Sequence, residues 1–314
     1  MDPRSLTVVS PDSASASPRV HCDGLVATDL VAVVDFPVPR DEKVRLDTFV
    51  RQGGGPAANA SVAVARLGGR ASFSGAVGED AVGAEQIAEL RDEGVGVAGM
   101  VAIPGVPSFL SMILVDTSDG ARTIYSAPGQ APQRRASDAP ALDPETALLL
   151  VDGWGGDAQL EVARRAAAAG IPALLDAGSD RPPVRALLEH IPIVIGSTPF
   201  ATSFAGSGDP ADGVRALLAA GARLAAVTHG ETGCTAGAAG SDEIFRVPAF
   251  SVPVVDTTGA GDAFHAGAAF ALASGRPWAD SLRWGAAVAA LKCREAGARG
   301  GLPTAAETAA LALG

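Results

Sequence analysis

The 314-residue sequence predicts an α/β fold in which helices cover both faces of a mostly parallel central sheet. Apolar runs of strand length alternate with longer runs of helical spacing, and no change of composition divides the chain. Hydrophobic residues make up 47% of the chain but aromatic residues only 4%. Ala, Val and Leu must therefore fill the interior, which favours close packing of helices on a sheet.

The first half of the chain should contribute core strands, two helices and a small separate lid. The expected core strands are 20–28, 71–76 and 147–151. The expected helices are 57–67 and 81–93, because glycines follow both segments. Turn residues separate the expected lid strands, which are 30–36, 43–49, 108–115 and 122–126, within lid segments of about 30–52 and 105–126.

The second half continues the alternation that is typical of parallel strands with crossover helices. The expected strands are 173–176, 193–195, 224–228, strands within 234–247, and a short apolar strand at 250–255. The expected helices are 158–169, 184–190, 214–220, 263–273 and 278–293.

The most informative motif is the stretch 256–264 (DTTGAGDAF), where the apolar strand turns into a helix. Gly259 and Gly261 have no side chains to block the approach of a ligand, and Thr257 or Thr258 is a candidate helix cap. Free N–H groups in the first helical turn bind phosphoryl oxygens, and the helix dipole favours negative charge there.

Asp262 lies in the same helical turn and is expected to stay ionised beside the helix dipole. Phosphoryl transfer through a loose transition state needs positioning and charge stabilisation more than a strong base. Asp262 would then orient the attacking hydroxyl and accept its proton late. The alternative is an ordinary capped turn in which the Asp only complements the dipole.

A second glycine-rich loop, 52–59 (QGGGPAAN), leads into the helix that ends at Gly68-Gly69. Asn59 lies in the first turns of this small, apolar helix, and its amide both donates and accepts hydrogen bonds. A polyol would use both functions, whereas a solvent-facing Asn is the alternative.

Two segments, 53–69 (GGGPAANASVAVARLGG) and 256–270 (DTTGAGDAFHAGAAF), resemble the two signatures of the ribokinase-like, PfkB-type carbohydrate kinase family, in the family's order. The stretches 76–80 and 227–233 continue the resemblance, which covers about residues 20–304. The first signature and the tail 288–293 look closest to the ketohexokinase and sulfofructose kinase branches. The resemblance implies a ribokinase-like three-layer sandwich, with residues 20–314 as the kinase domain.

The resemblance also implies roles for individual residues. Asp262 would be the catalytic base, and Gly259, Ala260 and Gly261 would form the anion hole. The implied sugar-binding residues are Asp29, Gly54, Gly55 and Asn59. Outside the family context, Asp29 reads as a turn residue at the end of a strand.

The nucleotide side follows in the same way. The implied nucleotide-binding residues are Thr228, Gly230, Gly233 and Arg122. Arg122 follows a turn, so a solvated hairpin Arg is its alternative. Asp256 and Thr258 resemble residues that frame a monovalent cation, so the implied cofactors are ATP, Mg²⁺ and K⁺.

Two departures from the family narrow the prediction. The stretch 196–200 (GSTPF) lacks the Asn-x-x-Glu motif that many members use for Mg²⁺ and phosphate, although the ketohexokinase-like branch also has a Ser there. Gly153 stands where a sulfonate-binding pocket would carry Arg, so sulfofructose is not the expected substrate.

The formal net charge of −11 argues against nucleic acid or an anionic membrane as a partner. Three cysteines without metal-ligand spacing suggest a reducing, cytoplasmic setting. Residues 1–19 lack the pattern of a signal peptide and read as a disordered tail. Exposed lid edges and the family resemblance suggest a homodimer formed through the lid.

Three functions compete. The preferred one is an ATP-dependent sugar kinase that phosphorylates a primary hydroxyl of a ketose, sugar acid or related polyol. A nucleoside kinase of the same fold would need an aromatic surface for a base, for which Tyr125, Phe109 and Trp154 are the candidates. A non-catalytic sugar sensor is disfavoured because Asp262 and its glycines are intact.

Overall fold

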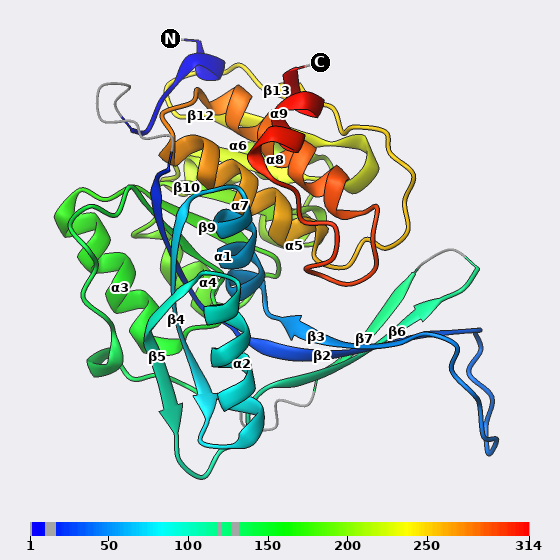
Figure 1. The fold of residues 1–314 in the computed structure, drawn as a ribbon. Helices are drawn as coiled ribbons and strands as arrows, with labels where there is room; N and C mark the ends of the chain where they lie inside the picture. Colours follow the sequence, from blue (N-terminus) through cyan, green and yellow to red (C-terminus); the bar gives the residue numbers. More distant parts are fainter. Residues whose placement is uncertain (1, 10–16, 119–120, 127–131, 314) are drawn as a thin grey trace.

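The computed structural model describes residues 2–9, 17–118, 121–126 and 132–313, and within them a nine-stranded sheet forms the centre of the molecule (Figure 1). Its strand order is β13-β12-β11-β10-β9-β8-β1-β4-β5, and all neighbours from β11 to β5 are parallel. The strands are β1 (Arg19–Asp23), β4 (Arg70–Gly78), β5 (Gly96–Ile103), β8 (Leu148–Val151), β9 (Ala173–Ala177), β10 (Ile193–Ser197), β11 (Leu224–Thr228), β12 (Cys234–Ala238) and β13 (Phe245–Val247). The predicted mostly parallel sheet is confirmed.

Helices cover both faces of this sheet (Figure 1). The sheet separates the core into two apolar clusters, one under each layer of helices. The helices that pack into the first cluster are α1 (Pro56–Arg66), α2 (Ala81–Asp92), α7 (Ala260–Ala273), α8 (Trp278–Lys292) and α9 (Ala305–Leu313). The helices of the second are α3 (Gly156–Ala169), α4 (Pro182–Leu188), α5 (Thr198–Ala205) and α6 (Pro210–Ala219). Small alanine side chains, together with glycines that have none, let α1 and α8 pack closely on α7, as the composition predicts.

A second sheet of four strands forms the lid, in the order β3-β2-β6-β7. Its strands are β2 (Ala27–Val34), β3 (Phe49–Gly54), β6 (Leu110–Asp116) and β7 (Arg122–Ser126). Figure 1 shows this sheet projecting from the main body, with the connection between β2 and β3 at its far end. Strands β6 and β7 lie within the predicted segment 105–126, whereas β2 begins before the predicted segment 30–52 and β3 ends after it.

Three predicted strands are wrong in position. The segment 20–28 is not one core strand, because the chain leaves the main sheet after Asp23 and joins the lid as β2. Residues 43–48 form no strand, and β3 instead includes the Gln-Gly-Gly that was expected to be a loop. Residues 250–255 are also irregular, because the N–H groups of Val255 and Asp256 donate to the carbonyl of Cys293 rather than to a strand.

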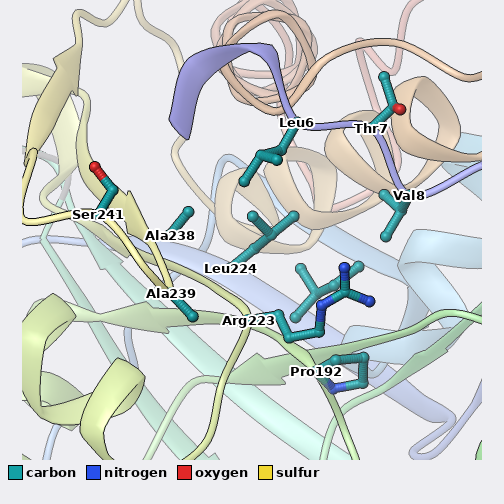
Figure 2. Close-up of a pocket in the computed structure, with 10 residues that line it drawn as sticks. Leu6, Thr7, Val8, Pro192, Arg223, Leu224, Ala238, Ala239 and Ser241 are labelled. Atoms are coloured by element: carbon teal, nitrogen blue, oxygen red, sulfur yellow. The ribbon is translucent and has the colours of Figure 1, made fainter. Parts of the chain in front are cut away.

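The described residues of the N-terminal segment, 2–9 and 17–19, pack on the body, whereas residues 1 and 10–16 of the predicted disordered tail lie outside the described residues. Trp278 N donates to Leu6 O over 2.8 Å, and Pro3 is buried. Residues 6–8 cover a cavity of about 160 Å³ at the amino ends of β10 and β11 (Figure 2). This cavity lies at the opposite edge of the sheet from the predicted site, since Ser197 and Thr228 end the same two strands. No described helix is long and apolar enough to cross a membrane.

Candidate active site

The first turn of α7 presents free backbone donors, as the motif predicts, but no threonine caps it. Gly259 is the N-cap with φ of 75°, a backbone conformation that favours glycine, and no side chain satisfies the turn. A Cβ at Gly259 would also lie 2.8 Å from Ala298 Cα. The N–H groups of Gly261 and Asp262 make no hydrogen bond to another described residue, so they remain available to an anion.

The Asp262 carboxylate contacts the other predicted motif directly. Asn59 Nδ2 donates to Asp262 Oδ2 over 2.7 Å, across 203 residues of sequence. The amide of Asn59 is oriented in turn by Arg299, whose Nε donates to Asn59 Oδ1 over 3.0 Å. Among the described residues, no hydrogen bond reaches the Oδ1 atom of the Asp262 carboxylate.

Asp29 lies on β2 of the lid, beside this pair, and only 7% of it is exposed. Burial and the negative charge of Asp262 raise the pKa of Asp29 to about 6. A Cβ at Gly54, on the neighbouring strand β3, would lie 2.2 Å from Asp29 Oδ2, so only glycine leaves room for this carboxylate. Asp29, Gly54, Asn59 and Asp262 therefore form one cluster.

Gly55 forms the turn that leads from β3 into α1. Its φ is 93°, and a Cβ there would lie 2.4 Å from Leu25 O. The buried carboxylate of Asp152 anchors this turn, because it accepts hydrogen bonds from Leu25 N at 2.9 Å and Ala57 N at 3.1 Å. The sequence analysis missed Asp152, although a carboxylate directly after the buried strand β8 was a usable signal.

A cavity of about 770 Å³ lies on the other side of the α7 N-terminus. Thr228, Gly230, Gly233 and Arg122 all line it, together with Ala260 and Gly261 of the glycine motif. Its far wall is apolar and is made by Phe264, Ala286, Ala289, Ala290 and Cys293. The four predicted nucleotide residues are thus brought together, beside the free N–H groups of α7.

Arg122 connects the lid to this cavity. It begins β7, and its Nη1 donates to Thr257 Oγ1 over 2.8 Å. Gly233, at the opposite wall, has φ of 96°, and a Cβ there would lie 2.1 Å from Val247 O. The loop after β11 is therefore closely packed against β13.

Of the two residues predicted to frame a monovalent cation, Asp256 has its carboxylate occupied by protein groups, whereas the buried hydroxyl of Thr258 has no hydrogen-bond partner among the described residues. Asp256 Oδ1 accepts from Thr258 N at 2.8 Å, and Oδ2 accepts from Gly297 N at 2.7 Å. Although burial acts in the other direction, these hydrogen bonds hold the pKa of Asp256 below its usual value. The backbone oxygen of Asp256 accepts from Lys292 Nζ at 2.8 Å, so a free cation does not fit where the side chain of Lys292 lies.

Arg299 and Glu89 were also missed. Arg299 Nη1 pairs with Glu89 Oε1 at 2.9 Å, and Glu89 Oε1 accepts from Gly53 N at 3.0 Å. A Cβ at Gly53 would lie 2.0 Å from Arg299 Nη1, which explains a third glycine in the loop. Neither residue belongs to a motif, and only the fold brings them to the cluster.

Arg134 is buried, and it forms an ion pair at the end of β1. Its Nη2 donates to Asp23 Oδ1 over 2.6 Å, at the end of β1. Burial removes water from both charged groups of this pair, so its stability depends on good geometry. The role of Arg134 is therefore to neutralise the buried carboxylate of Asp23.

The molecule has a mostly parallel sheet, a separate lid sheet and an uncapped glycine turn beside a carboxylate. This combination is typical of α/β phosphotransferases. Residues 17–305 match the pfkB family carbohydrate kinases. The chain is 28% identical to the ribokinase of Bacillus subtilis, covering 90% of this chain and 94% of that protein. It is 27% identical to the ketohexokinase of Mus musculus, covering 88% and 96%.

Solved structures agree. The structure of Arabidopsis thaliana ribokinase, complexed with ribose and ATP, superposes with a TM-score of 0.81 at 25% identity and covers 95% of this chain and 99% of that one. The chain therefore belongs to the PfkB family of carbohydrate kinases and has its ribokinase-like fold. Its activity is that of an ATP-dependent kinase of this family.

Proposed function

We propose that this kinase transfers the γ-phosphoryl group of ATP to a primary hydroxyl of a ketose, sugar acid or related small polyol. The observation that carries the proposal is the position of Asp262. Its carboxylate contacts Asn59 in the acceptor cluster, while Ala260 and Gly261, directly before it, line the nucleotide cavity. The first turn of α7 would thus lie between the sugar and ATP and contact both of them.

On the acceptor side, Asp29 and Asn59 would hold hydroxyl groups of the sugar, and Gly54 and Gly55 would leave the space for its carbon chain. Asp262 Oδ1 would accept the hydrogen of the attacking hydroxyl and take its proton as the new O–P bond forms. The amide of Asn59 fixes Asp262 Oδ2, so the carboxylate is oriented before the sugar binds.

On the donor side, the N–H groups of Gly261 and Asp262 would stabilise the charge on the transferred phosphoryl group. Thr228, Gly230, Gly233 and Arg122 would contact the nucleotide. Within the described residues, no three acidic, imidazole or thiol side chains converge on a metal position. When bound, Mg²⁺ takes most of its ligands from water and substrate phosphates, and it would neutralise the charge of the ATP phosphates.

The competing nucleoside substrate has less support. Tyr125 is 56% exposed and pairs with Met112 on the lid, away from the Asp29 face. Trp154 already has Arg181 over one ring face at 3.7 Å and Phe109 against it at 6.4 Å. Neither ring offers a free surface beside Asp29 on which a base would stack.

A homodimer formed through the lid is part of the proposal. Phe49, Met112 and Tyr125 share one lid face, according to the strand register, and each is more than half exposed. Such an apolar patch on a small sheet favours burial against another surface.

The three cysteines are buried thiols, which supports a reducing compartment such as the cytoplasm.

The test is ADP release from ATP and Mg²⁺ against ketoses, sugar acids, phosphosugars and nucleosides, with Asp262→Asn beside the native chain. One sugar class should stimulate turnover, and the variant should lose about 10²–10⁴-fold in kcat. Asp280→Asn is the matched control, because Asp280 is an exposed carboxylate in the first turn of α8. It should leave turnover unchanged.

The outcomes separate the three functions. Stimulation by nucleosides alone would replace the proposal by a nucleoside kinase. Binding of sugars without turnover would indicate a sensor. An Asp262→Asn variant with native turnover would remove Asp262 from the chemistry.

A further inference from the structure

The end of α8 contains a buried lysine that the proposed reaction does not use. Lys292 is fully buried, at 0% exposure. The chain has 24 basic residues of the Lys and Arg types, but only Lys43 and Lys292 are lysines. Lys43 is exposed on the connection between β2 and β3. Because the chain otherwise uses Arg almost throughout, the local surroundings of position 292, rather than the general composition, must explain the choice of a lysine there.

Backbone oxygens, rather than a carboxylate, are the groups that Lys292 contacts directly. Its Nζ donates to Asp256 O at 2.8 Å and lies 3.4 Å from Glu295 O. An ammonium is a compact charge with donors in several directions, whereas the planar fork of Arg suits carboxylates and phosphates. Carbonyl oxygens that converge on one positive point also form the usual ligand set of a monovalent cation.

This contact lies at the base of the anion-binding turn. The segment 292–298 is joined to 255–259 by three sets of backbone and side-chain hydrogen bonds. Cys293 O accepts from Val255 N and Asp256 N, Gly297 N donates to Asp256 Oδ2, and the Lys292 ammonium bridges the two segments through their carbonyls. Ala298 lies directly against Gly259. Displacement at Asp256 would therefore move the N–H groups of α7.

Hydrogen bonds to carbonyl oxygens oppose the cost of burying the Lys292 ammonium. Burial holds the pKa of Lys292 below its usual value and Arg122 adds to the lowering, while the negative charges of Asp256 and Asp262 act in the opposite direction. A buried charge is costly unless it is paired and hydrogen-bonded, so replacing it by an apolar group would leave carbonyls unpaired.

We propose that the ammonium group of Lys292 is a built-in replacement for the monovalent cation beside the anion hole, so that this kinase does not require K⁺. The inference rests on the proposed kinase function and changes one expectation from the sequence. The backbone oxygens of Asp256 and Glu295 frame a cation, but that cation is covalently part of the chain.

The first experiment uses the native enzyme and compares KCl with choline chloride at equal ionic strength. Both turnover with the identified sugar and the melting temperature without substrate should be the same, with kcat values within about twofold. Stimulation of the native enzyme by K⁺ of about tenfold or more would overturn the inference.

The second experiment uses Lys292→Ala and Lys292→Met. The Ala variant leaves the carbonyl oxygens of Asp256 and Glu295 without a cation and opens space for K⁺ beside them. It should therefore lose at least about tenfold in kcat without K⁺ and recover with KCl but not with choline chloride. The Met variant fills the same space with an apolar chain, so K⁺ should not restore it. Arg294→Ala is the matched control, because it removes an exposed cation two residues away.

Melting temperature separates this inference from the kinase proposal. A rise in the melting temperature of Lys292→Ala with KCl alone would support the cation role even if no sugar were phosphorylated. Variants with native turnover and native melting temperature in choline chloride would contradict it. If both variants fail to fold, the native enzyme's response to K⁺ decides the question.

Discussion

At the scale of single residues, Asp29 combines a proposed role in sugar binding with a cost in stability. Its carboxylate is buried near the charges of Asp262 and Glu89, and only Arg299 and a hydrogen bond from Ser111 oppose them. The pKa of Asp29 is about 6 in the folded chain, above the ordinary value near 4. The folded state therefore binds a proton more tightly than the unfolded state, and ionised Asp29 destabilises the fold at neutral pH.

Asp29→Asn should accordingly raise the free energy of unfolding by about 2–3 kcal/mol above pH 6. The gain should shrink as pH falls from about 6 to about 4, where native Asp29 becomes protonated in both states. Sugar affinity should move the other way, falling in the native enzyme below about pH 6 and being weak at every pH in the variant. Urea unfolding and calorimetric titration with sugar, across this pH range, measure both.

A pH-independent stability difference would mean that Asp29 is not the titrating group. Ser111→Ala supplies a second check, because loss of its hydrogen bond should raise the pKa of Asp29 further.

At the scale of elements, the lid has two unlike faces. The register places Asp29, Val31 and Ile113 on one face, where Val31 and Ile113 are buried. Met112, Tyr125 and Phe49 lie on the opposite face, exposed by 51%, 56% and 59%. Strand alternation thus places the Asp29 carboxylate on one face of the lid and an exposed apolar surface on the other.

Met112→Lys should therefore convert a homodimer into a monomer of 31.2 kDa, because the change places an uncompensated charge in the apolar contact. Sedimentation at micromolar concentration measures the mass. Ala168→Lys, an equivalent change at an exposed position of α3, should leave the dimer intact. A native chain that sediments as a monomer would remove the dimer proposal.

Elements with a complete local signal were predictable from the sequence, whereas elements defined by partners were not. Helix α7 has glycines at its start and small apolar residues along its length, so its position was recognisable. The predicted strand at 250–255 has the right composition, but its backbone groups bond to Cys293, which lies far along the chain. The predicted strand at 20–28 failed because nothing local shows that the chain changes sheets after Asp23.

At the scale of the whole molecule, the candidate site exists only where distant segments meet. The motifs predicted Asn59 and Asp262 separately, and the fold brings them within hydrogen-bond distance. Arg299 completes that contact from 240 residues beyond Asn59, without a recognisable motif around it. The family resemblance could therefore indicate both motifs, but the contacts of Arg299 with Asn59 and of Lys292 with Asp256 could be found only from coordinates.

The lid joins the acceptor cluster to an otherwise exposed connection, so sugar binding should change the accessibility of that connection. Residues 35–48 lie between β2 and β3 and extend away from the body (Figure 1). Lys43 and Arg45 are exposed there and are trypsin sites. Because Asp29 and Gly54 belong to the two flanking strands, a bound sugar should hold both strands and slow cleavage.

Limited trypsin digestion with and without sugar measures this effect. Asp262→Asn should keep the protection, since it removes the base but not the lid contact, whereas Asp29→Ala should lose it. A non-hydrolysable ATP analogue alone should protect less. Among the described lid strands, only β7 contributes a residue, Arg122, to the cavity of about 770 Å³, so the analogue would not hold β2 and β3 directly. Equal protection by nucleotide alone would indicate that the lid responds to the donor side, and sugar closure of the lid would then be the wrong description.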